Sequence, residues 1–385
     1  MRVVINALSA RYGGGKTYLW NLLEHVEERS DWQILVLAEP ALVLPEKKNI
    51  QRLPQHPETT NPFYRSVWER CHIPRLLNEQ RADIYFCPGG VLNVKVPSAC
   101  RSVVMFRNML PFDRETRSRY GFGYMKVRNL LLEGVLLNSM RNADLLICVS
   151  EYARGLIEKR LGDRKGAMVT ISHGVADDFR GPQVQQVVRP AWIPKEEYLL
   201  YVSFLELYKN QLEVIRGYSI LRQIRRTSEK LVLVGHSETP YGRKVRREIR
   251  RRGLEKDVLL MGTVAYEELP KLYQHAKINL FASSCENCPN IMLEAMASGR
   301  PLLASKLDTM REFGGDAAVY FNPHDPEDIA QRIASVIDDE TLLRKLSEMV
   351  GQRAERYTWK STAALTVSAI SQLAAGHTVD DRSLV

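Results

Sequence analysis

The sequence predicts an α/β protein of two successive domains, each built around a parallel β-sheet. Short apolar runs alternate with helix-length amphipathic stretches, which is the pattern of parallel βαβ units. The 385 residues exceed the roughly 250–300 at which a single core stops growing. A polar stretch with prolines, from Arg180-Gly181-Pro182 to Pro190 and Pro194, interrupts the alternation and is typical of a linker. We therefore expect domains at residues 1–182 and 190–357.

The expected strands are short, mostly apolar runs. In the first domain they are Val3–Leu8, Ile34–Ala38, Ile84–Cys87, Val103–Phe106, Leu145–Val149 and Met168–Ile171. In the second they are Tyr198–Val202, Leu231–Val234, Val258–Met261, Ile278–Phe281, Pro301–Ala304 and Val319–Phe321. Helices are expected between several of them, at Thr17–Glu28, Glu151–Arg160 and around Leu212–Arg222.

From Pro326 onward we expect helix throughout, interrupted at Tyr357-Thr358-Trp359. The residues after Trp359 are apolar on one face and need a partner, which we expect to be the first domain. Those residues are Ala363, Leu365, Ala369, Ile370 and Leu373.

The composition excludes several classes of protein. Hydrophobic residues make up 45% and charged residues 26%, as in ordinary globular proteins. No run approaches the ~18 apolar residues of a membrane span. The apolar run at the N-terminus is too short for a secretory signal. We therefore expect a cytoplasmic location. Six cysteines do not make a disulfide scaffold at this length. We interpret Cys285-Glu286-Asn287-Cys288 as incidental because no second ligand pair follows, and a redox pair stays open.

The net charge of +9 predicts an anionic partner without identifying it. The run Arg243–Arg252 is typical of a solvated helix face. A second basic stretch is interleaved with aromatic residues and leads into Leu130-Leu131-Leu132, as in segments that meet anionic lipid. An ordinary basic helix has a similar composition, so both interpretations stay open. Nucleic acid is not expected, since no recognised module accompanies the charge. The second stretch comprises Arg114, Arg117, Arg119, Lys126 and Arg128, with Tyr120, Phe122, Tyr124 and Met125.

The glycine-rich segment Ala10–Thr17 lies between an expected strand and an expected helix. Gly15-Lys16-Thr17 fits a relaxed phosphate loop, in which backbone amides cradle phosphates and the Lys and Thr reach phosphate and metal. A nucleotide hydrolase or phosphotransferase is therefore the main alternative function. Against it, Ala10 replaces the first glycine of the motif, and no later strand ends in a convincing metal-binding Asp. We favour a loop that lets a ligand approach the backbone closely.

The most informative segment runs from Ser283 to Pro301. Strand Ile278–Phe281 delivers it to the carboxyl edge of a parallel sheet, where open α/β sheets bind ligands. We expect Asn290 to cap a short helix, Ile291–Ser298, which Gly299 ends. Glu286 then lies in the loop and Glu294 in the first turns of the helix. The free amides of the helix N-terminus form an anion site suited to a diphosphate.

This segment resembles the signature of the retaining glycosyltransferases of family four, whose fold is the GT-B architecture of two Rossmann-like domains. Glu286 and Glu294 match its Glu, seven residues, Glu, and a small-residue helix with Gly and Pro follows. The resemblance implies that Glu286 meets the donor sugar, that Glu294 meets the ribose, and that Asn290 and Ile291 lie at the donor. It covers nearly the whole chain, most specifically residues 198–305.

Other segments agree with this family, although three positions depart from it. Tyr201–Asn210 resembles the loop of the family's basic pair, and Lys209 matches the lysine that neutralises the donor phosphates. The departures are Phe204 in place of Arg, Arg107 in place of His, and Pro289 in place of Gly. The remaining matches are Gly13-Gly14-Gly15 at the diphosphate, Gly235 and Thr263 on the base side with Glu267–Ala276 as the following helix, and Arg107, Asn108 and His173 on the acceptor side.

The resemblance implies a retaining, metal-independent hexosyltransferase. It would move a sugar from a UDP- or GDP-sugar to a saccharide or lipid-linked saccharide, as in cell-surface polysaccharide or lipopolysaccharide biosynthesis. The nucleotide sugar is a co-substrate, and neither a cofactor nor a bound metal is expected. The tail of about residues 358–385 would complete the first domain, and membrane contact would place the protein at the inner face of the membrane. A catalytically silent partner subunit is the remaining alternative, which retention of Glu286, Glu294 and Lys209 disfavours.

Overall fold

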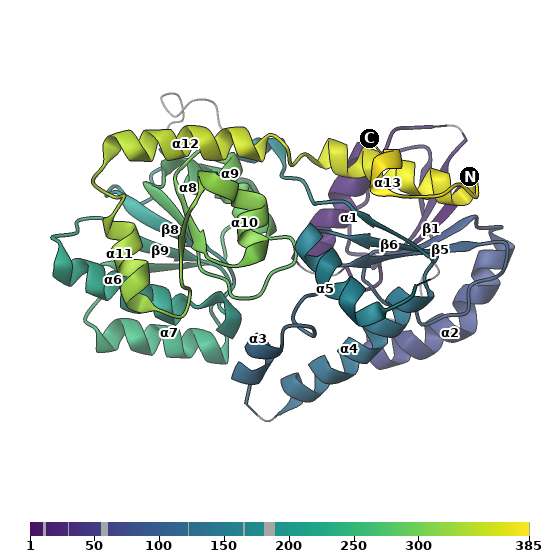
Figure 1. Cartoon of the computed structure of the whole chain (residues 1–385), viewed down its shortest axis with the longest axis horizontal. Coiled ribbons are helices and arrows are strands. Elements are labelled where there is room, and N and C mark those ends of the chain that lie inside the picture. Colours follow the sequence, from purple (N-terminus) through teal and green to yellow (C-terminus); the bar gives the residue numbers. More distant parts are fainter. Residues whose placement is uncertain are drawn as a thin grey trace. The chain divides into compact units, whose positions relative to one another are not determined.

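A computed structural model describes residues 1–10, 13–29, 31–54, 61–121, 123–164, 166–180 and 189–384. Arg11, Tyr12, Phe122 and the linker residues 181–188 therefore lie outside the described part. The chain forms two compact units. Unit 1 comprises Met1–Arg117, Phe122–Gly174 and Trp359–Val385, and unit 2 comprises Ser118–Gly121 and Val175–Thr358. Each unit has a parallel sheet covered by helices (Figure 1), which confirms the predicted fold class of two Rossmann-like domains.

Unit 1 is built on a seven-stranded sheet in the order β3-β2-β1-β4-β5-β6-β7. The order reverses between β1 and β4, which pair in parallel with Ile5 opposite Phe86. This reversal is a topological switch point, beyond whose carboxyl ends open sheets bind ligands. The strands are β1 (Arg2–Asn6), β2 (Gln33–Leu37), β3 (Ile50–Arg52), β4 (Ile84–Cys87), β5 (Arg101–Phe106), β6 (Leu145–Cys148) and β7 (Ala167–Thr170). The helices are α1 (Gly14–His25), α2 (Pro62–Glu79), α3 (Arg114–Arg119), α4 (Tyr124–Asn142), α5 (Glu151–Leu161), α13 (Trp359–Ala374) and η7 (Asp381–Leu384).

Unit 2 is built on a six-stranded sheet in the order β10-β9-β8-β11-β12-β13, whose switch point lies between β8 and β11. The strands are β8 (Tyr198–Val202), β9 (Lys230–Val234), β10 (Val258–Gly262), β11 (Ile278–Phe281), β12 (Leu302–Ser305) and β13 (Val319–Phe321). The α-helices are α6 (Gln211–Ile224), α7 (Pro240–Arg251), α8 (Leu269–His275), α9 (Asn290–Ala297), α10 (Asp308–Gly314), α11 (Pro326–Ala334) and α12 (Glu340–Ala354). The short 3-10 turns are η2 (Asp177–Phe179), η4 (Leu207–Lys209), η5 (Tyr266–Glu268) and η6 (Gly315–Ala317).

The expected strands are all present, with ends that shift by at most two residues. Several helical predictions were wrong in detail, and the helix expected at Thr17–Glu28 begins and ends three residues earlier, as α1 (Gly14–His25). The helix expected at Glu267–Ala276 is divided into η5 and α8, because Pro270 at the start of α8 lacks the amide proton that a continuous helix would need. The region after Pro326 is not helical throughout, since α11 and α12 are separated and Asp339 caps the start of α12 by accepting from the Leu342 amide.

The chain from Trp359 onward packs within unit 1. Helix α13 lies against α1, with the Trp359 ring 6.1 Å from that of Tyr18. The Thr362 hydroxyl donates to the Ser172 carbonyl at 2.8 Å. Beyond the helix, the Asp381 carboxylate accepts from the Thr170 amide at 2.8 Å, at the end of the edge strand β7. These bonds attach the tail to the sheet of unit 1.

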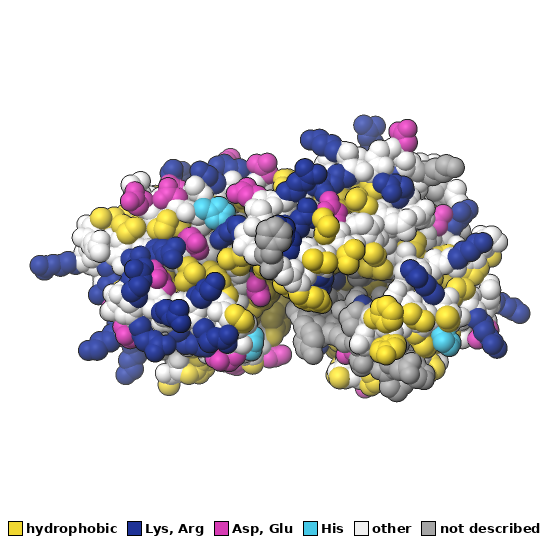
Figure 2. Space-filling view, turned by 90° about the horizontal axis from the view of Figure 1, so that it is seen from below, with side chains coloured by type: hydrophobic (Ala, Val, Ile, Leu, Met, Phe, Trp, Pro, Cys, Tyr) yellow, Lys and Arg dark blue, Asp and Glu magenta, His cyan; other side chains and the backbone are white. Residues whose placement is uncertain are grey.

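The surface of unit 2 carries the basic run that the sequence predicted to be a solvated helix face. Helix α7 buries Val245 and Ile249, and turns its basic side chains outward. Figure 2 shows Lys and Arg gathered over unit 2 on the face that carries this helix. The exposed basic residues are Arg243, Lys244, Arg247, Arg250 and Arg251.

Candidate active site

In unit 2, the loop after β8 is tied to the loop after β11 at the switch point. Asn210 follows η4 in the left-handed conformation, with φ of 53°, and its side-chain amide donates to the Ala282 carbonyl at 2.7 Å. The Ser284 amide donates in turn to the Tyr208 carbonyl at 2.7 Å. These bonds fix the loop that carries Lys209 against the loop that carries Glu286.

The Lys209 ammonium forms an ion pair with the Glu286 carboxylate. The Lys209 side chain is 4% exposed and that of Glu286 is 15% exposed, so solvent screens this pair little. Three aromatic rings surround the ammonium, those of Phe204, Tyr208 and Phe281, at 5.1–5.5 Å from it. Ring faces stabilise a cation at this range. The family's arginine position, occupied here by Phe204, therefore contributes a ring beside the lysine.

Helix α9 begins one residue earlier than the sequence predicted. Pro289, not Asn290, occupies the cap position, and Asn290 is the first helical residue. The Pro289 carbonyl accepts the first intrahelical bond from the Leu293 amide at 3.0 Å, so the amides of Ile291 and Met292 belong to the unpaired first turn. Gly299 has φ of +65° just beyond the helix, as predicted. The helix N-terminus keeps its capacity to bind an anion.

Glu294 lies in the interior of unit 2. It is 6% exposed, and the Tyr266 hydroxyl donates to its carboxylate at 3.1 Å, with that of Tyr273 at 3.5 Å. The Phe179 ring from η2 packs against both tyrosine rings. Burial raises the pKa of Glu294 from its ordinary 4.5 to about 8, and the two phenol hydrogen bonds oppose this rise. Because this pKa lies above neutral pH, the buried Glu294 side chain is mostly protonated there and still accepts hydrogen bonds.

The base-side residues lie where neighbouring strands end. Gly235 follows β9, and its amide donates to the Gly262 carbonyl at 2.8 Å. Gly235 has φ of +141°, and a Cβ there would lie 2.2 Å from the Ser203 carbonyl oxygen. Only glycine fits this site, because both the conformation and the space exclude a side chain. Thr263 follows β10 and is exposed.

In unit 1, one aromatic ring joins the glycine loop to two of the acceptor-side candidates. The Arg107 guanidinium lies 5.2 Å from the Tyr18 ring of α1, and it also lies near Gly15. His173 also packs on the Tyr18 ring, with 5.1 Å between the two ring centres. His173 is 3% exposed, so it is enclosed by aromatic rings and not presented to solvent. Gly14 and Asn108 are exposed.

The structure adds an arginine that sequence reasoning did not place here. Arg119, in the Ser118–Gly121 segment of unit 2, donates from Nη1 to Asn210 Oδ1 at 2.8 Å and to Ser284 Oγ at 3.3 Å. Arg117 in unit 1 is ion-paired with Glu133 at 2.5 Å. Both arginines of the basic stretch are thus held by polar partners within the protein. No sequence pattern could have indicated contacts this distant along the chain.

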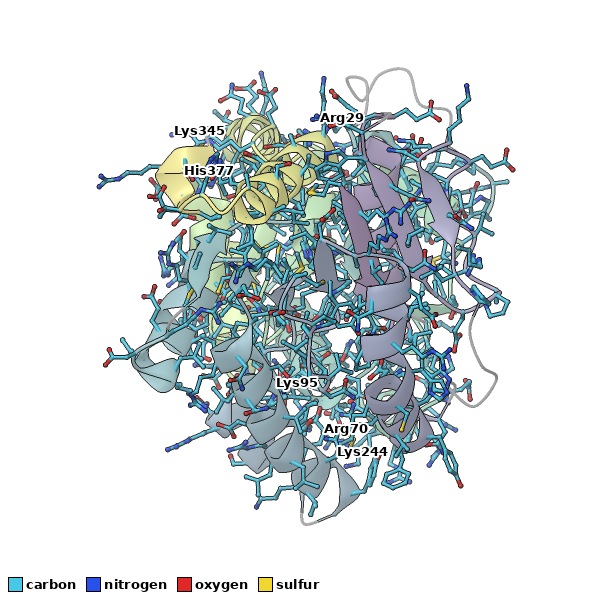
Figure 3. All side chains as sticks on the ribbon, turned by 90° about the vertical axis from the view of Figure 1, so that its right-hand side faces the viewer. Arg29, Arg70, Lys95, Lys244, Lys345 and His377 are labelled. Atoms are coloured by element: carbon cyan, nitrogen blue, oxygen red, sulfur yellow. The ribbon has the colours of Figure 1, made fainter. Side chains whose placement is uncertain are left out.

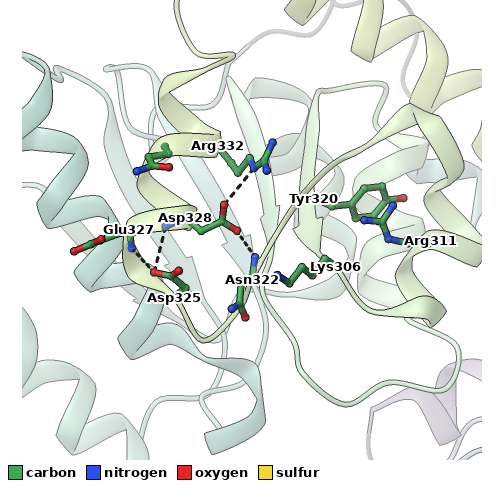
Figure 4. Close-up of a pocket in the computed structure, with 9 residues that line it drawn as sticks. Lys306, Arg311, Tyr320, Asn322, Asp325, Glu327, Asp328 and Arg332 are labelled. Atoms are coloured by element: carbon green, nitrogen blue, oxygen red, sulfur yellow. Dashed lines mark hydrogen bonds and ion pairs between the residues drawn. The ribbon is translucent and has the colours of Figure 1, made fainter.

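A polar pocket of about 320 Å³ lies beyond the carboxyl ends of β12 and β13 (Figure 4). Asp328 accepts from the Asn322 amide at 2.6 Å and pairs with Arg332 at 3.3 Å. The Arg311 guanidinium lies 4.7 Å from the Tyr320 ring. The charges of Asp328 and Arg332 compensate one another within the pocket. The sequence did not predict this pocket.

Comparison with protein families matches both halves of the chain. Residues 12–179 match the model described as Glycosyltransferase Family 4, and residues 185–356 match Glycosyl transferases group 1. The chain is a family 4 glycosyltransferase. The glycine loop therefore belongs to a glycosyltransferase domain, and the phosphate-loop alternative is not retained.

Relatives of this glycosyltransferase include mannosyltransferases. O-antigen chain mannosyltransferase B of Escherichia coli is 27% identical over 64% of the chain and 66% of its own length. The serotype-specific mannosyltransferase WbdA of Escherichia coli is 24% identical over 62% of the chain, but the match spans 30% of that relative's length. The chain thus spans less than two thirds of the length of these curated relatives.

Solved structures show that this glycosyltransferase has the GT-B fold. Sucrose-phosphate synthase from Thermosynechococcus elongatus superposes with a TM-score of 0.76 at 16% identity, covering 98% of this chain and all of that one. The Anabaena protein HepE, solved with UDP and glucose, superposes with a TM-score of 0.73 at 17% identity, covering 97% of this chain and all of that one. These likenesses establish the fold.

Proposed function

We propose that this glycosyltransferase moves a hexosyl group from a UDP- or GDP-sugar to a saccharide or lipid-linked saccharide, with retention of anomeric configuration. The observation that carries the proposal is the enclosed Lys209–Glu286 pair beside the N-terminus of α9, with Glu294 further along that helix. The loops after β8 and β11, together with helix α9, thereby offer a cation, backbone amides and two carboxylates to a nucleotide sugar. The mannosyltransferase relatives make mannose the first sugar to test and favour a role in surface polysaccharide synthesis.

In the proposed reaction, the diphosphate lies between Lys209 and the first-turn amides of α9, and a ribose hydroxyl donates to Glu294. The bond from the anomeric carbon to the diphosphate oxygen breaks, and a bond from that carbon to the acceptor oxygen forms on the same face. The acceptor proton passes to the departing diphosphate. Prepositioned donors aimed at the developing negative charge contribute about 3 kcal/mol each. Glu286 orients sugar hydroxyls and holds the lysine in place before the donor arrives.

We further propose that the reaction requires neither a cofactor nor a metal ion. Lys209 and the helix amides would supply the charge compensation that a divalent cation supplies elsewhere. Titration with EDTA tests this directly. Turnover that survives chelation supports the proposal, and turnover that is lost and then restored by Mg²⁺ or Mn²⁺ contradicts it.

The first experiment is a thermal-shift series with UDP, GDP, ADP, dTDP and ATP, with and without Mg²⁺. The diphosphate of the donor should raise the melting temperature without Mg²⁺, and Glu294→Ala should abolish the shift. Lys16→Ala is the matched control, because Lys16 is exposed in the glycine loop of unit 1. A magnesium-dependent ATP shift lost in Lys16→Ala would contradict the proposal. Sugar transfer by the wild type that Glu286→Ala abolishes would exclude a catalytically silent subunit.

We also propose that helix α4 contacts an anionic membrane surface, at the inner face of the membrane. Among the described residues, no helix is both long and apolar enough to cross a bilayer. On α4, however, Tyr124, Val127, Leu130 and Leu131 are 59–77% exposed, and the exposed Arg128 lies between them. Hydrophobic side chains gather over unit 1 on the face shown in Figure 2. Exposed apolar residues beside a cation suit an interfacial position.

Flotation with phosphatidylglycerol-containing and purely zwitterionic vesicles tests the membrane proposal. The wild type should float with the anionic vesicles, and Leu130→Asp/Leu131→Asp should not. Val43→Asp is the control, since Val43 is 70% exposed but lies outside α4. Equal flotation of the wild type and the double variant would refute the role of α4.

A further inference from the structure

Unit 1 contains a pocket of about 190 Å³ at the switch point of its sheet. Asn6 is the last residue of β1 and Cys87 the last of β4, and both line it. Helix α2 supplies Arg65, Ser66 and Glu69 to its wall. The pocket therefore lies where an open parallel sheet binds its ligand. None of these residues was predicted from the sequence to belong to a site.

Helix α2 and the loop after β4 supply most of the pocket wall, and helix α4 adds one residue. Figure 1 shows α2 next to α4, and Figure 3 labels Arg70 of α2 and Lys95 of the loop after β4. Arg70 donates from Nε to the Asn93 carbonyl at 3.3 Å, which joins α2 to that loop. Val135 of α4 and Val91 of the loop add an apolar surface to the pocket.

A buried carboxylate organises the polar side of the pocket. Glu69 is 5% exposed. One of its oxygens accepts from Asn6 Nδ2 at 2.9 Å and the other from Asn93 Nδ2 at 2.8 Å. Each carboxylate oxygen can accept about two hydrogen bonds, so both oxygens retain capacity toward a ligand. The amides hold the carboxylate in one orientation.

These groups select the chemistry of the ligand. The Arg65 guanidinium lies 3.9 Å from the Glu69 carboxylate and compensates its charge, so this part of the pocket wall carries little net charge and suits a neutral ligand. Asn6 donates its two amide N–H groups to Glu69 and Tyr85. Asn93 donates its two to Ser66 and Glu69. The pocket thus combines carboxylate and amide oxygens as hydrogen-bond acceptors with the hydroxyls of Ser9 and Ser66 and a small apolar surface. A neutral ring that carries several hydroxyl groups satisfies such a set. The volume is below the roughly 300 Å³ at which pockets for larger ligands begin, so it fits one ring.

We propose that this pocket binds one hexose ring of the acceptor saccharide, with the Glu69 carboxylate accepting from its hydroxyls. The inference rests on the proposed function, because it assigns the acceptor of that reaction a place in unit 1. It names a site apart from Arg107, Asn108 and His173, which sequence reasoning assigned to the acceptor.

The test is saturation-transfer NMR on the full chain with methyl glycosides of mannose, glucose, galactose and N-acetylglucosamine. At least one glycoside should give a ring signal with the wild type. Ser66→Phe, which fills the pocket from α2, should abolish the signal. Val67→Phe is the control, since Val67 is 50% exposed on the same helix and does not line the pocket. Glu69→Gln, with its fold verified by circular dichroism, should weaken glycoside binding about tenfold, as loss of a charged hydrogen bond implies.

Nucleotide binding separates this proposal from the proposed function. UDP or GDP should shift the melting temperature equally in the wild type, Ser66→Phe and Val67→Phe. A glycoside signal that persists in Ser66→Phe, or its absence from a wild type that still binds a nucleotide, overturns the pocket assignment. Loss of the nucleotide shift in Ser66→Phe would overturn it as well, because the pocket would then serve the donor. A wild type that binds glycoside but no nucleotide would refute the proposed function and leave the sugar pocket standing.

Discussion

The side chains of Lys209 and Glu286 are 77 residues apart in sequence and form an ion pair enclosed by aromatic rings. The lysine comes from the loop after β8 and the glutamate from the loop after β11, adjacent strands at the switch point of unit 2. The pair keeps the Lys209 cation in a fixed position at this switch point. Removal of either partner would leave a charge with little solvent around it.

Lys209→Met should therefore reduce sugar transfer about 100- to 1,000-fold, the usual cost of losing one group that stabilises a developing anion. The change also leaves Glu286 without its ion-pair partner, so the melting temperature should fall. Lys277→Met is the matched control, because Lys277 is 13% exposed and ion-paired with Glu229 at 2.9 Å in the same unit. Steady-state kinetics should show intact transfer in this control. Comparable losses in both variants would mean that Lys209 acts only through stability.

Glu294→Gln should change how stability depends on pH. The folded state holds a proton on Glu294 up to a pKa of about 8, whereas the ordinary value is 4.5. Between these values the unfolded state binds fewer protons, so the free energy of unfolding of the wild type falls as pH rises. The slope is at most about 1.4 kcal/mol per pH unit. The contribution is fully present below pH 4.5 and is lost above about pH 8.

Urea unfolding of both proteins between pH 5 and pH 9 measures this difference. The wild type should lose stability relative to Glu294→Gln up to about pH 8, and the difference should then remain constant. Parallel curves over the whole range would show that Glu294 titrates normally.

The strands were predictable from sequence because buried parallel strands consist of nearly continuous apolar runs. Tyr198–Val202 and Ile278–Phe281 are such runs, and both are buried along their whole length. β3 is only Ile50–Arg52, with an exposed Gln51 at its centre, and it lies at the sheet edge. It has no apolar run to detect. Helix α2 was missed although Asn61 caps it and Pro62 opens it, because Pro74 lies inside it.

The residues themselves indicated the site only in the segment that carries Glu286 and Glu294, and Lys209 was predicted through the resemblance to family four. Glu286 and Glu294 were identified from their spacing. The strand before them places Glu286 in the loop at the carboxyl edge of the sheet and Glu294 in the helix that follows. The surroundings of Glu294 were not predicted, because its partners Tyr266 and Tyr273 and the adjoining Phe179 come from separate elements that tertiary packing brings together. Glu69 was missed for the same reason, since its amide partners Asn6 and Asn93 lie 63 and 24 residues away.

Gly235→Ala should destabilise unit 2 by about 3 kcal/mol, because the new methyl group would overlap the Ser203 carbonyl oxygen. Gly253→Ala provides the control. Gly253 has φ of +65° but open space around it, so the change should cost only about 1 kcal/mol for the left-handed backbone. Chemical denaturation of the two variants separates the conformational cost from the overlap. Similar losses would show that the loop after β8 moves to accept the methyl group.

Phe204→Arg should strengthen binding of the donor diphosphate. Phe204 is 45% exposed and its ring centre lies 5.5 Å from the Lys209 ammonium, so an arginine can occupy this position without being buried. In the unliganded protein the added cation lies near Lys209, and the melting temperature should fall slightly. A bound diphosphate relieves this repulsion and gains a charge-assisted hydrogen bond worth about 1.5–3 kcal/mol, so UDP or GDP affinity should rise at least about tenfold.

Calorimetric titration at several salt concentrations tests this gain, which should shrink as salt rises because the added interaction is between charges near the surface. Phe204→Leu is the control, since it removes the ring without adding a charge and should not strengthen binding. An affinity for the diphosphate that is equal in Phe204→Arg and the wild type at low salt would show that position 204 does not reach the phosphates. The phenylalanine would then act only through its ring beside Lys209.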